Sequence, residues 1–221
     1  ERLLSPKFTS DAFDRIKNKA IEDIKNSKTN AANVASQAYD MMLYGPKNIL
    51  GQPSSGTEAT VAKITLADIE MYYKKYISRN GANIIVVGDI DKAGMTAITT
   101  SLMKLPNKAV NLPILPKAMT SAEKNTVYVV DIPKAAQTEF RVGYLTDLKY
   151  DATGDYYKSS LMNYVFGGSF NGRININLRE DKGWTYGARS NFLGNDYTGS
   201  FTFSSGIKSS ATDSALMEVV T

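Results

Sequence analysis

Two side chains in the stretch NLREDKGWTYGARS, residues 177–190, have the types and the spacing to bind an oxygen atom. Arg179 stands near the end of an expected helix, and Tyr186 follows seven residues later, beyond Gly183. A guanidinium and a phenol are hydrogen-bond donors of well-defined geometry. If Gly183 turns the helix back into a strand, both side chains reach one edge, where they can hold a peptide carbonyl or stabilise an oxyanion.

A plainer interpretation of the same residues stays open. Short motifs arise often by chance, and Arg179 can simply form a surface ion pair with Glu180 or Asp181 while Tyr186 packs in the core. The spacing by itself favours this structural interpretation over a binding site.

The chain contains no His and no Cys, which excludes several kinds of catalysis. A Ser-His-Asp or Cys-His nucleophile cannot form, and neither can a zinc site with His or Cys ligands. Catalysis by this chain alone would therefore need paired carboxylates, a Lys or a Tyr. We expect no metal site and no catalytic residue in this chain. Its 26 basic and 22 acidic residues give a net charge of +4, without a basic block that would indicate nucleic-acid binding. No apolar run approaches the roughly 20 residues that a membrane helix requires.

The elements that must position Arg179 and Tyr186 can be outlined from periodicity and capping signals. In the first half we expect helices over 10–28, 29–45 and 65–78, the last opened by a Thr65–Asp68 capping box, then a buried strand over 83–90 and a helix capped by Asp91. In the second half we expect strands over 126–132 and 137–145, helices over 155–168 and 173–183, a hairpin over 184–206 and a helix from Ser209.

This pattern predicts an α+β fold of two tandem, related units, each a mainly antiparallel sheet packed with helices. A proline-rich, non-periodic stretch separates them. We expect a first domain over 1–110, a linker over 111–124 and a second domain over 125–221 that carries the Arg179/Tyr186 segment. The chain lacks an initial Met and stops within an expected helix, so we expect both units to be truncated and the chain to be a piece of a longer protein.

The segment NYVFGGSFNGRININLREDKGWTYGARS resembles the insulinase/pitrilysin family of zinc metallopeptidases, including its processing-peptidase-like branch. The match is to the non-catalytic domain of that family: a Gly-Gly pair, an Arg, then Leu-Arg-Glu, then Gly and Tyr. NIIVVGDID and VDIPKAAQTEFRVGY are similar to family segments in the same order, so the resemblance covers nearly the whole chain.

The resemblance implies a division of labour between two halves that close around an extended peptide. One half carries zinc on a His-x-x-Glu-His motif with a distal Glu, and the other contributes an Arg and a Tyr that contact the substrate. Arg179 and Tyr186 match that pair with the spacing kept. Arg173 and Glu180 match positions that hold the helix and its turn, and Gly183 is the structural residue that ends that helix.

We therefore expect the substrate-binding, non-catalytic part of a zinc-dependent peptidase. Zinc would lie in a catalytic half with the His-x-x-Glu-His motif, in the same polypeptide or a separate subunit, and the substrate would be a peptide or an unfolded polypeptide. The alternative is a catalytically inactive scaffold or interaction subunit of the same fold. Abundant Ser, Thr and Asn without Cys suits a bacterial periplasmic or other extracytoplasmic protein.

Overall fold

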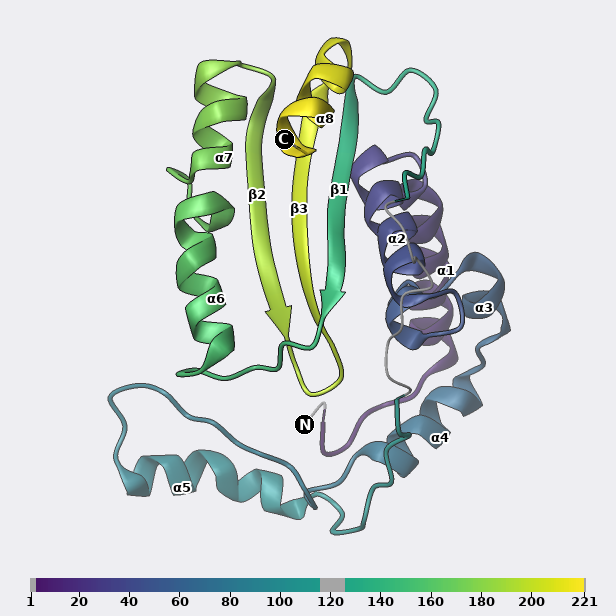
Figure 1. Ribbon diagram of the computed structural model, residues 1–221. Coiled ribbons are helices and arrows are strands. Elements are labelled where there is room, and N and C mark those ends of the chain that lie inside the picture. The colour runs from purple at the N-terminus through teal and green to yellow at the C-terminus, as the bar shows by residue number, and fades with distance from the viewer. Residues whose placement is uncertain (1–2, 116–125, 221) are drawn as a thin grey trace. The chain divides into compact units, whose positions relative to one another are not determined.

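The computed structural model describes residues 3–115 and 126–220 of the 221-residue chain (Figure 1). The residues group into two compact units. The first combines the chain up to Asp23 with Thr57–Ile114, and the second combines Ile24–Gly56 with the chain from Leu115 onward. The predicted domains were two continuous ranges, 1–110 and 125–221. In the structure the segment 24–56 belongs to the second unit, so neither unit is one continuous range. The predicted linker lies largely outside the described residues.

The first unit is helical, and its helices begin where the sequence supplies caps. Its elements are α3 (Glu58–Lys63), α4 (Leu66–Tyr76), α5 (Lys92–Thr100), the 3₁₀ turn η2 (Ser101–Lys104) and the first part of α1 (Ser10–Ser27). The predicted capping box is present: the Asp68 N–H donates to Thr65 Oγ1 at 3.2 Å, and the Thr65 N–H donates to Asp68 Oδ2 at 2.8 Å. Asp91 caps α5 as predicted, accepting from the Gly94 N–H at 2.7 Å.

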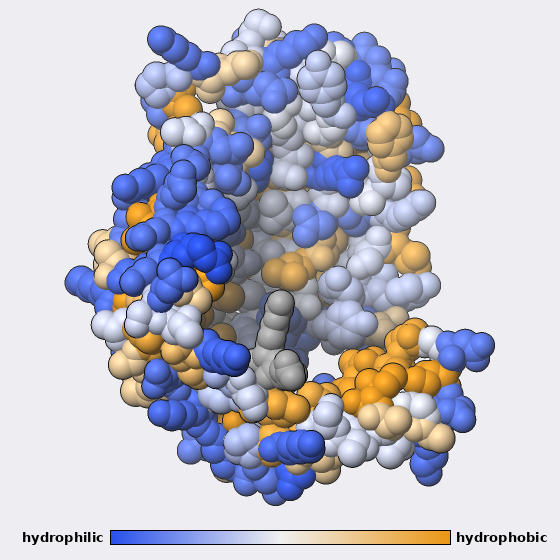
Figure 2. All heavy atoms as spheres, turned by 180° about the vertical axis from the view of Figure 1, so that it is seen from behind, coloured by the Kyte–Doolittle hydropathy of each residue, from blue (hydrophilic) through white to orange (hydrophobic). Residues whose placement is uncertain are grey.

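The predicted strand over 83–90 is wrong. Residues 82–87 have no regular secondary structure, and Ile85 and Val87 are 86% and 92% exposed instead of buried. A strand exists only where a neighbour satisfies its N–H and C=O groups, and the described residues of this unit contain no strand to pair with. Figure 2 shows apolar side chains gathered around α5.

The second unit is α+β and contains the sheet. Its elements are α2 (Ala31–Tyr44), η1 (Ile49–Gly51), β1 (Gln137–Thr146), α6 (Asp155–Asn163), η3 (Tyr164–Gly168), α7 (Arg173–Asn175), η4 (Ile176–Asp181), β2 (Thr185–Gly194), β3 (Gly199–Lys208), η5 (Ser209–Ala211) and α8 (Thr212–Val220). The predicted strand over 126–132 is also wrong, because this segment has no ladder and Val129 is 88% exposed. The other predicted elements of this half are present.

The three strands form one antiparallel sheet in the order β1-β3-β2. β2 and β3 are the predicted hairpin, and Asn195 closes its turn by accepting from the N–H groups of Tyr197 and Thr198 at 2.8 and 2.9 Å. Successive residues of a strand face opposite sides, so β3 alternates between an apolar face with Phe203 and Ile207 and a polar face with Ser204.

Helices cover the apolar face and build the core there. Figure 1 shows α6 and α7 along β2, and α8 lying across the strands. The buried cluster contains one residue of η4, one of β2, two of β3, one of η5 and one of α8, namely Leu178, Ala188, Phe203, Ile207, Ala211 and Ala215. Burial of these side chains at about 25 cal/mol per Å² of apolar surface fixes the helices that precede β2 against the sheet. The Arg179/Tyr186 segment is thereby tied to the core.

Candidate substrate-contacting site

Arg179 and Tyr186 lie on the two sides of one chain reversal. Arg179 belongs to η4, a π-helical turn in which the Lys182 N–H reaches the carbonyl of Asn177 at 3.1 Å. Gly183 ends this helix with φ of +62°, in the left-handed region that favours glycine. Its N–H donates to the carbonyl of Arg179 at 3.1 Å, as in a C-terminal glycine cap. The predicted structural role of Gly183 matches this geometry.

A β-bulge at the start of β2 turns Tyr186 outward. Thr185 pairs with Ile207 and Ala188 with Ser205, so that two residues, Tyr186 and Gly187, lie opposite one residue of β3. Tyr186 is 89% exposed, and its hydroxyl has no hydrogen-bond partner among the residues that the structure describes. A large aromatic side chain held this far into solvent on a hydrogen-bonded strand is available to a ligand.

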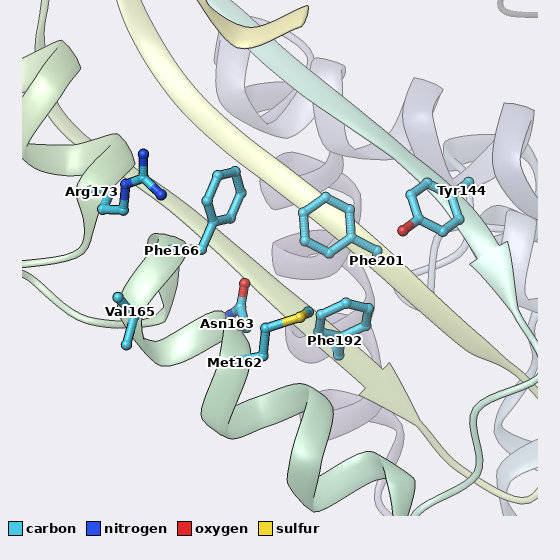
Figure 3. Close-up of a pocket in the computed structure, with 8 residues that line it drawn as sticks. All are labelled: Tyr144, Met162, Asn163, Val165, Phe166, Arg173, Phe192 and Phe201. Atoms are coloured by element: carbon cyan, nitrogen blue, oxygen red, sulfur yellow. The ribbon is translucent and has the colours of Figure 1, made fainter. Parts of the chain in front are cut away.

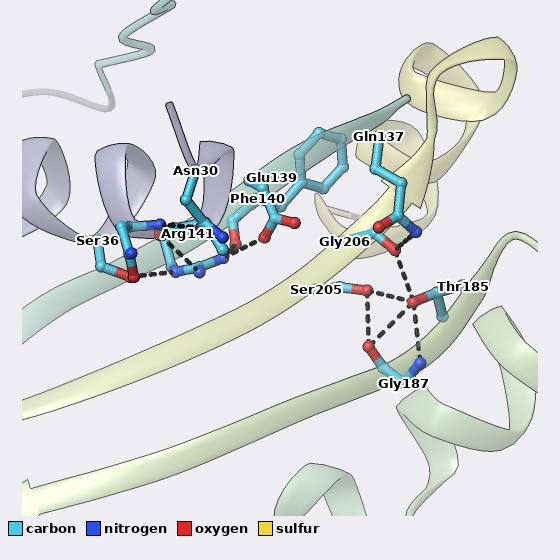
Figure 4. Close-up of polar contacts among 12 residues, drawn as sticks. Asn30, Ser36, Gln137, Glu139, Phe140, Arg141, Thr185, Gly187, Ser205 and Gly206 are labelled. Atoms are coloured by element: carbon cyan, nitrogen blue, oxygen red, sulfur yellow. Dashed lines mark hydrogen bonds and ion pairs between the residues drawn. The ribbon is translucent and has the colours of Figure 1, made fainter. Parts of the chain in front are cut away.

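Buried hydroxyls hold the bulge in place (Figure 4). The Thr185 hydroxyl donates to the carbonyl of Gly206 at 2.8 Å, and the Ser205 hydroxyl donates to the carbonyl of Gly187 at 3.0 Å. The N–H of Gly187 donates to Thr185 Oγ1 at 3.0 Å. Thr185 and Ser205 are both buried, so these bonds replace the ladder pairing that the bulge interrupts.

Two buried asparagines fasten the helices to the same strand. Asn163 donates to the carbonyl of Ser190 at 2.7 Å and accepts from the Ser190 hydroxyl. Asn175 donates to the carbonyl of Phe170 at 2.7 Å and accepts from the N–H of Ala188 at 2.9 Å. Both amides thus hydrogen-bond main-chain groups of β2, and both side chains are buried. The position of η4 relative to β2 is therefore fixed on two sides of the reversal.

Arg179 has partners of its own. Its Nη1 donates to Glu180 Oε1, and its guanidinium lies over the ring of Phe170, 4.6 Å from the centroid. No hydrogen bond joins Arg179 to Tyr186 in the described part of the chain. The structural interpretation was thus right that Arg179 pairs with Glu180 and wrong that Tyr186 lies in the core. Because the ion pair is half exposed, it contributes little stability and leaves Arg179 accessible to a carbonyl.

Arg173 is the first residue of α7, and its predicted structural role stays a prediction. It is exposed and lines an open cavity of about 590 Å³ over the apolar face of the sheet, between α6–η3 and the strands (Figure 3). The other lining residues are mostly apolar, and Figure 3 shows Phe166 between Arg173 and Phe201. Within the described ranges no hydrogen bond or ion pair holds Arg173 to the helix or its turn, whereas Glu180 has Arg179 as its partner.

The polar face of the sheet contains a cationic site that the sequence analysis missed. Arg141 on β1 donates to Glu139 at 3.1 Å, to the carbonyl of Phe140 at 2.7 Å and to the Ser36 hydroxyl of α2 at 3.2 Å (Figure 4). Burial raises the pKa of nearby Asp40, and Arg141 opposes that shift. Arg189 on β2 lies across Ser204 from Arg141. The sequence signal for Arg189 was its place between two small residues, Ala188 and Ser190, in a predicted strand whose successive side chains face opposite sides.

No cluster of three or more His, Cys, Asp or Glu side chains able to hold a metal ion occurs in residues 3–115 and 126–220. A search of the described helices also finds none long and apolar enough to cross a membrane.

The sequence matches the model of the family described as the peptidase M16 inactive domain over residues 63–220. The chain belongs to the peptidase M16 family. This membership confirms the predicted family resemblance. Pitrilysin has a similar fold, with a TM-score of 0.57 at 18% identity over 98% of this chain and 23% of pitrilysin. The matched range includes the Arg179/Tyr186 segment.

The crystal structure of a peptidase M16 inactive domain from Pseudomonas fluorescens has a TM-score of 0.85 to this chain, with 26% identity over 97% of this chain and 51% of that one. A curated relative, the non-peptidase homolog YmxG of Helicobacter pylori, is 27% identical over 87% of this chain and 44% of its own length. The periplasmic protease PqqL of Escherichia coli has the same fold, with 21% identity over 96% of this chain and 23% of PqqL and a TM-score of 0.62. The M16 chain thus spans about half the length of the first two relatives.

Proposed function

We propose that this M16 chain is the substrate-binding, non-catalytic part of a zinc-dependent peptidase that cleaves peptides or unfolded polypeptides. The observation that carries the proposal is the bulge at Tyr186. Buried hydrogen bonds hold the backbone there while the phenol stands almost fully in solvent, one reversal away from Arg179. A donor held rigidly in this way loses little conformational freedom when it binds a carbonyl.

The two side chains would have separate roles. The Tyr186 hydroxyl would donate to the oxyanion or to a nearby substrate carbonyl, while Arg179, released from Glu180, would hold a further carbonyl and fix the register of the peptide. The zinc would belong to a catalytic half with a His-x-x-Glu-His motif, fused to this chain or a separate subunit. That half would activate the water, and its Glu would act as base.

A scaffold role is the second candidate, and two observations favour it. The relative from Helicobacter pylori is named a non-peptidase homolog, and Arg179 already has a partner in Glu180. In that case Arg179 and Tyr186 would serve assembly or packing, and the M16 chain would support a partner without contacting its substrate. An extracytoplasmic location fits both candidates and is supported by the fold shared with a periplasmic protease.

Cleavage of an unstructured peptide separates the two candidates. The full-length polypeptide that contains this chain is assayed with zinc and with its catalytic partner, as the wild type and as Arg179→Ala and Tyr186→Phe. We expect each variant to lower kcat/KM by about 10²–10³, the usual loss when one oxyanion donor is removed. Tyr197→Phe is the matched control, because Tyr197 is another exposed tyrosine and lies in the hairpin turn. Cleavage indifferent to Arg179→Ala and Tyr186→Phe would establish the scaffold role.

A further inference from the structure

The polar face of the sheet has a shallow depression beside the bulge that carries Tyr186. Its volume is about 220 Å³, and it is lined by three residues of β1 and β2 that carry charge, two glycines and two serines, namely Glu139, Arg141, Arg189, Gly187, Gly206, Ser204 and Ser205. Gly187 belongs to the bulge itself, directly after Tyr186. A ligand that contacts Tyr186 therefore passes next to this depression.

The charges in the depression do not balance. Glu139 and Arg141 form an ion pair of 3.1 Å, with side chains only 16% and 15% exposed, so each neutralises the other. Arg141 is further occupied by main-chain and hydroxyl oxygens of β1 and α2. Arg189 is exposed, and no hydrogen bond or ion pair in the described part of the chain involves its guanidinium. One uncompensated positive charge therefore remains at the rim.

The surroundings of Arg189 suit a small anionic group. The neighbouring residue on β3 is Ser204, whose hydroxyl is the only side-chain polar group between the two arginines of that row. Gly187 has no side chain, and the nearest atom to the place of a Cβ there is 4.0 Å away, so main chain or a carboxylate can approach closely at Gly187, whereas the Glu139 carboxylate already lies over Gly206. Pockets that bind small molecules have volumes of at least about 300 Å³, so this depression of about 220 Å³ is better suited to one short side chain.

We propose that this depression receives a carboxylate of the bound peptide, with Arg189 as the residue that sets the preference. The inference rests on the proposed function, because Tyr186 and Arg179 are taken to hold the main chain of that peptide. A guanidinium binds a carboxylate through two parallel hydrogen bonds, which gives both attraction and a defined orientation. The carboxylate comes from an internal Asp or Glu side chain or from the peptide C-terminus.

Binding of four fluorescent peptides to the full-length polypeptide tests the inference by anisotropy. The peptides share one flexible sequence and differ by Asp or Asn at an internal position and by a free or an amidated C-terminus. The doubly neutral peptide has Asn and an amidated C-terminus. We expect the wild type to bind at least one of the peptides with a single carboxylate about five- to tenfold more tightly than the doubly neutral peptide, as one partly exposed charge-assisted hydrogen bond would give. In Arg189→Gln this ratio falls to about one. Arg15→Gln, which removes the same charge from α1, keeps the ratio.

Each outcome has a defined meaning. If the internal Asp gives the gain, the ligand is an acidic side chain, and if the free C-terminus gives it, the ligand is the peptide end. The carboxylate inference is wrong if the peptides bind but the carboxylate and doubly neutral peptides have nearly equal affinity, or if their affinity ratio is unchanged in Arg189→Gln. Neither result contradicts the proposed function. If no peptide binds to any form, the proposed function fails, and the inference fails with it.

Discussion

At the scale of the residue, the site depends on a few polar atoms in fixed places. The spacing of Arg179, Gly183 and Tyr186 could be recognised in the sequence because it is local, and Gly183 predicted the end of the helix. The outward position of Tyr186 could not be predicted, because it depends on a bulge held by Thr185 and Ser205, which are 20 residues apart. Whether Tyr186 is buried or exposed is thus decided by pairing between strands, which a sequence window does not contain.

The left-handed turn at Gly183 gives a residue-scale prediction. An alanine there places a Cβ in a conformation that costs L-residues roughly 1–2 kcal/mol, so Gly183→Ala lowers the free energy of unfolding by about that amount. Gly187→Ala is the matched control, since the nearest atom to its new Cβ is 4.0 Å away and its φ is not positive. We expect a change below about 0.5 kcal/mol for the control. Equal effects of the two changes in urea unfolding would contradict this account of the turn.

A second residue-scale prediction concerns the buried Asn163–Ser190 pair. Asn163→Leu keeps a similar size but leaves the Ser190 carbonyl and hydroxyl without their partner in the interior. Loss of one partner of a buried pair costs about 1–3 kcal/mol, which urea unfolding measures. The double variant Asn163→Leu/Ser190→Ala recovers part of that loss, because it removes the stranded hydroxyl. A double variant less stable than the sum of the single changes would show that the pair is not the source of the stability.

At the scale of the element, helices were predicted better than strands. The helices carry their own signals, such as the Thr65–Asp68 box and the Asp91 cap, and these are present in the structure. The strands over 137–145 and 184–206 were predicted correctly because each finds a neighbour in the sheet. The segments 83–90 and 126–132 have equally strong β-type composition, yet neither has a ladder. Composition measures the tendency to pair, and pairing itself requires a partner.

The attachment of α8 to the helix that carries Arg179 gives a prediction at this scale. Glu218 of α8 accepts from Asn177 at 2.8 Å and pairs with Lys182 at 3.1 Å. These bonds lower the pKa of Glu218 below its ordinary value of 4.5, and the hydrogen bond from Asn177 has the largest effect. A carboxylate with a lowered folded pKa contributes stability that is full above its unfolded pKa and is lost as pH falls through the folded pKa.

Glu218→Gln therefore destabilises the protein relative to the wild type at pH 6 to 7, and the difference shrinks to near zero as the solution is acidified well below pH 4.5. Thermal unfolding of both forms across this pH range measures the difference. Asp213→Asn, on the same helix, serves as a control for the loss of a negative charge from α8. A difference that is constant with pH would mean that Glu218 acts through packing and not through its charge.

At the scale of the whole molecule, the α+β class and the M16 family follow from the sequence, whereas the pairing of two apolar segments does not. Residues 83–87 and 127–130 have no strand pairing and carry exposed Ile, Val and Tyr side chains. Unpaired strands of this composition are templates for pairing with other chains. The 221-residue chain by itself is therefore expected to self-associate as its concentration rises, through these segments more than through its helical surfaces.

Charged residues in the first segment test this expectation. Lys side chains at an exposed strand oppose edge pairing, so Ile85→Lys/Val87→Lys lowers the mean mass measured by sedimentation velocity toward that of the 24.2 kDa monomer. Because both positions are almost fully exposed, the change leaves the helical circular dichroism signal intact. Ile16→Lys, at an exposed position of α1, adds charge outside the β-type segments and leaves the association as it was. If Ile16→Lys dissolves the assemblies equally well, general surface hydrophobicity drives association and the unpaired segments have no special part in it.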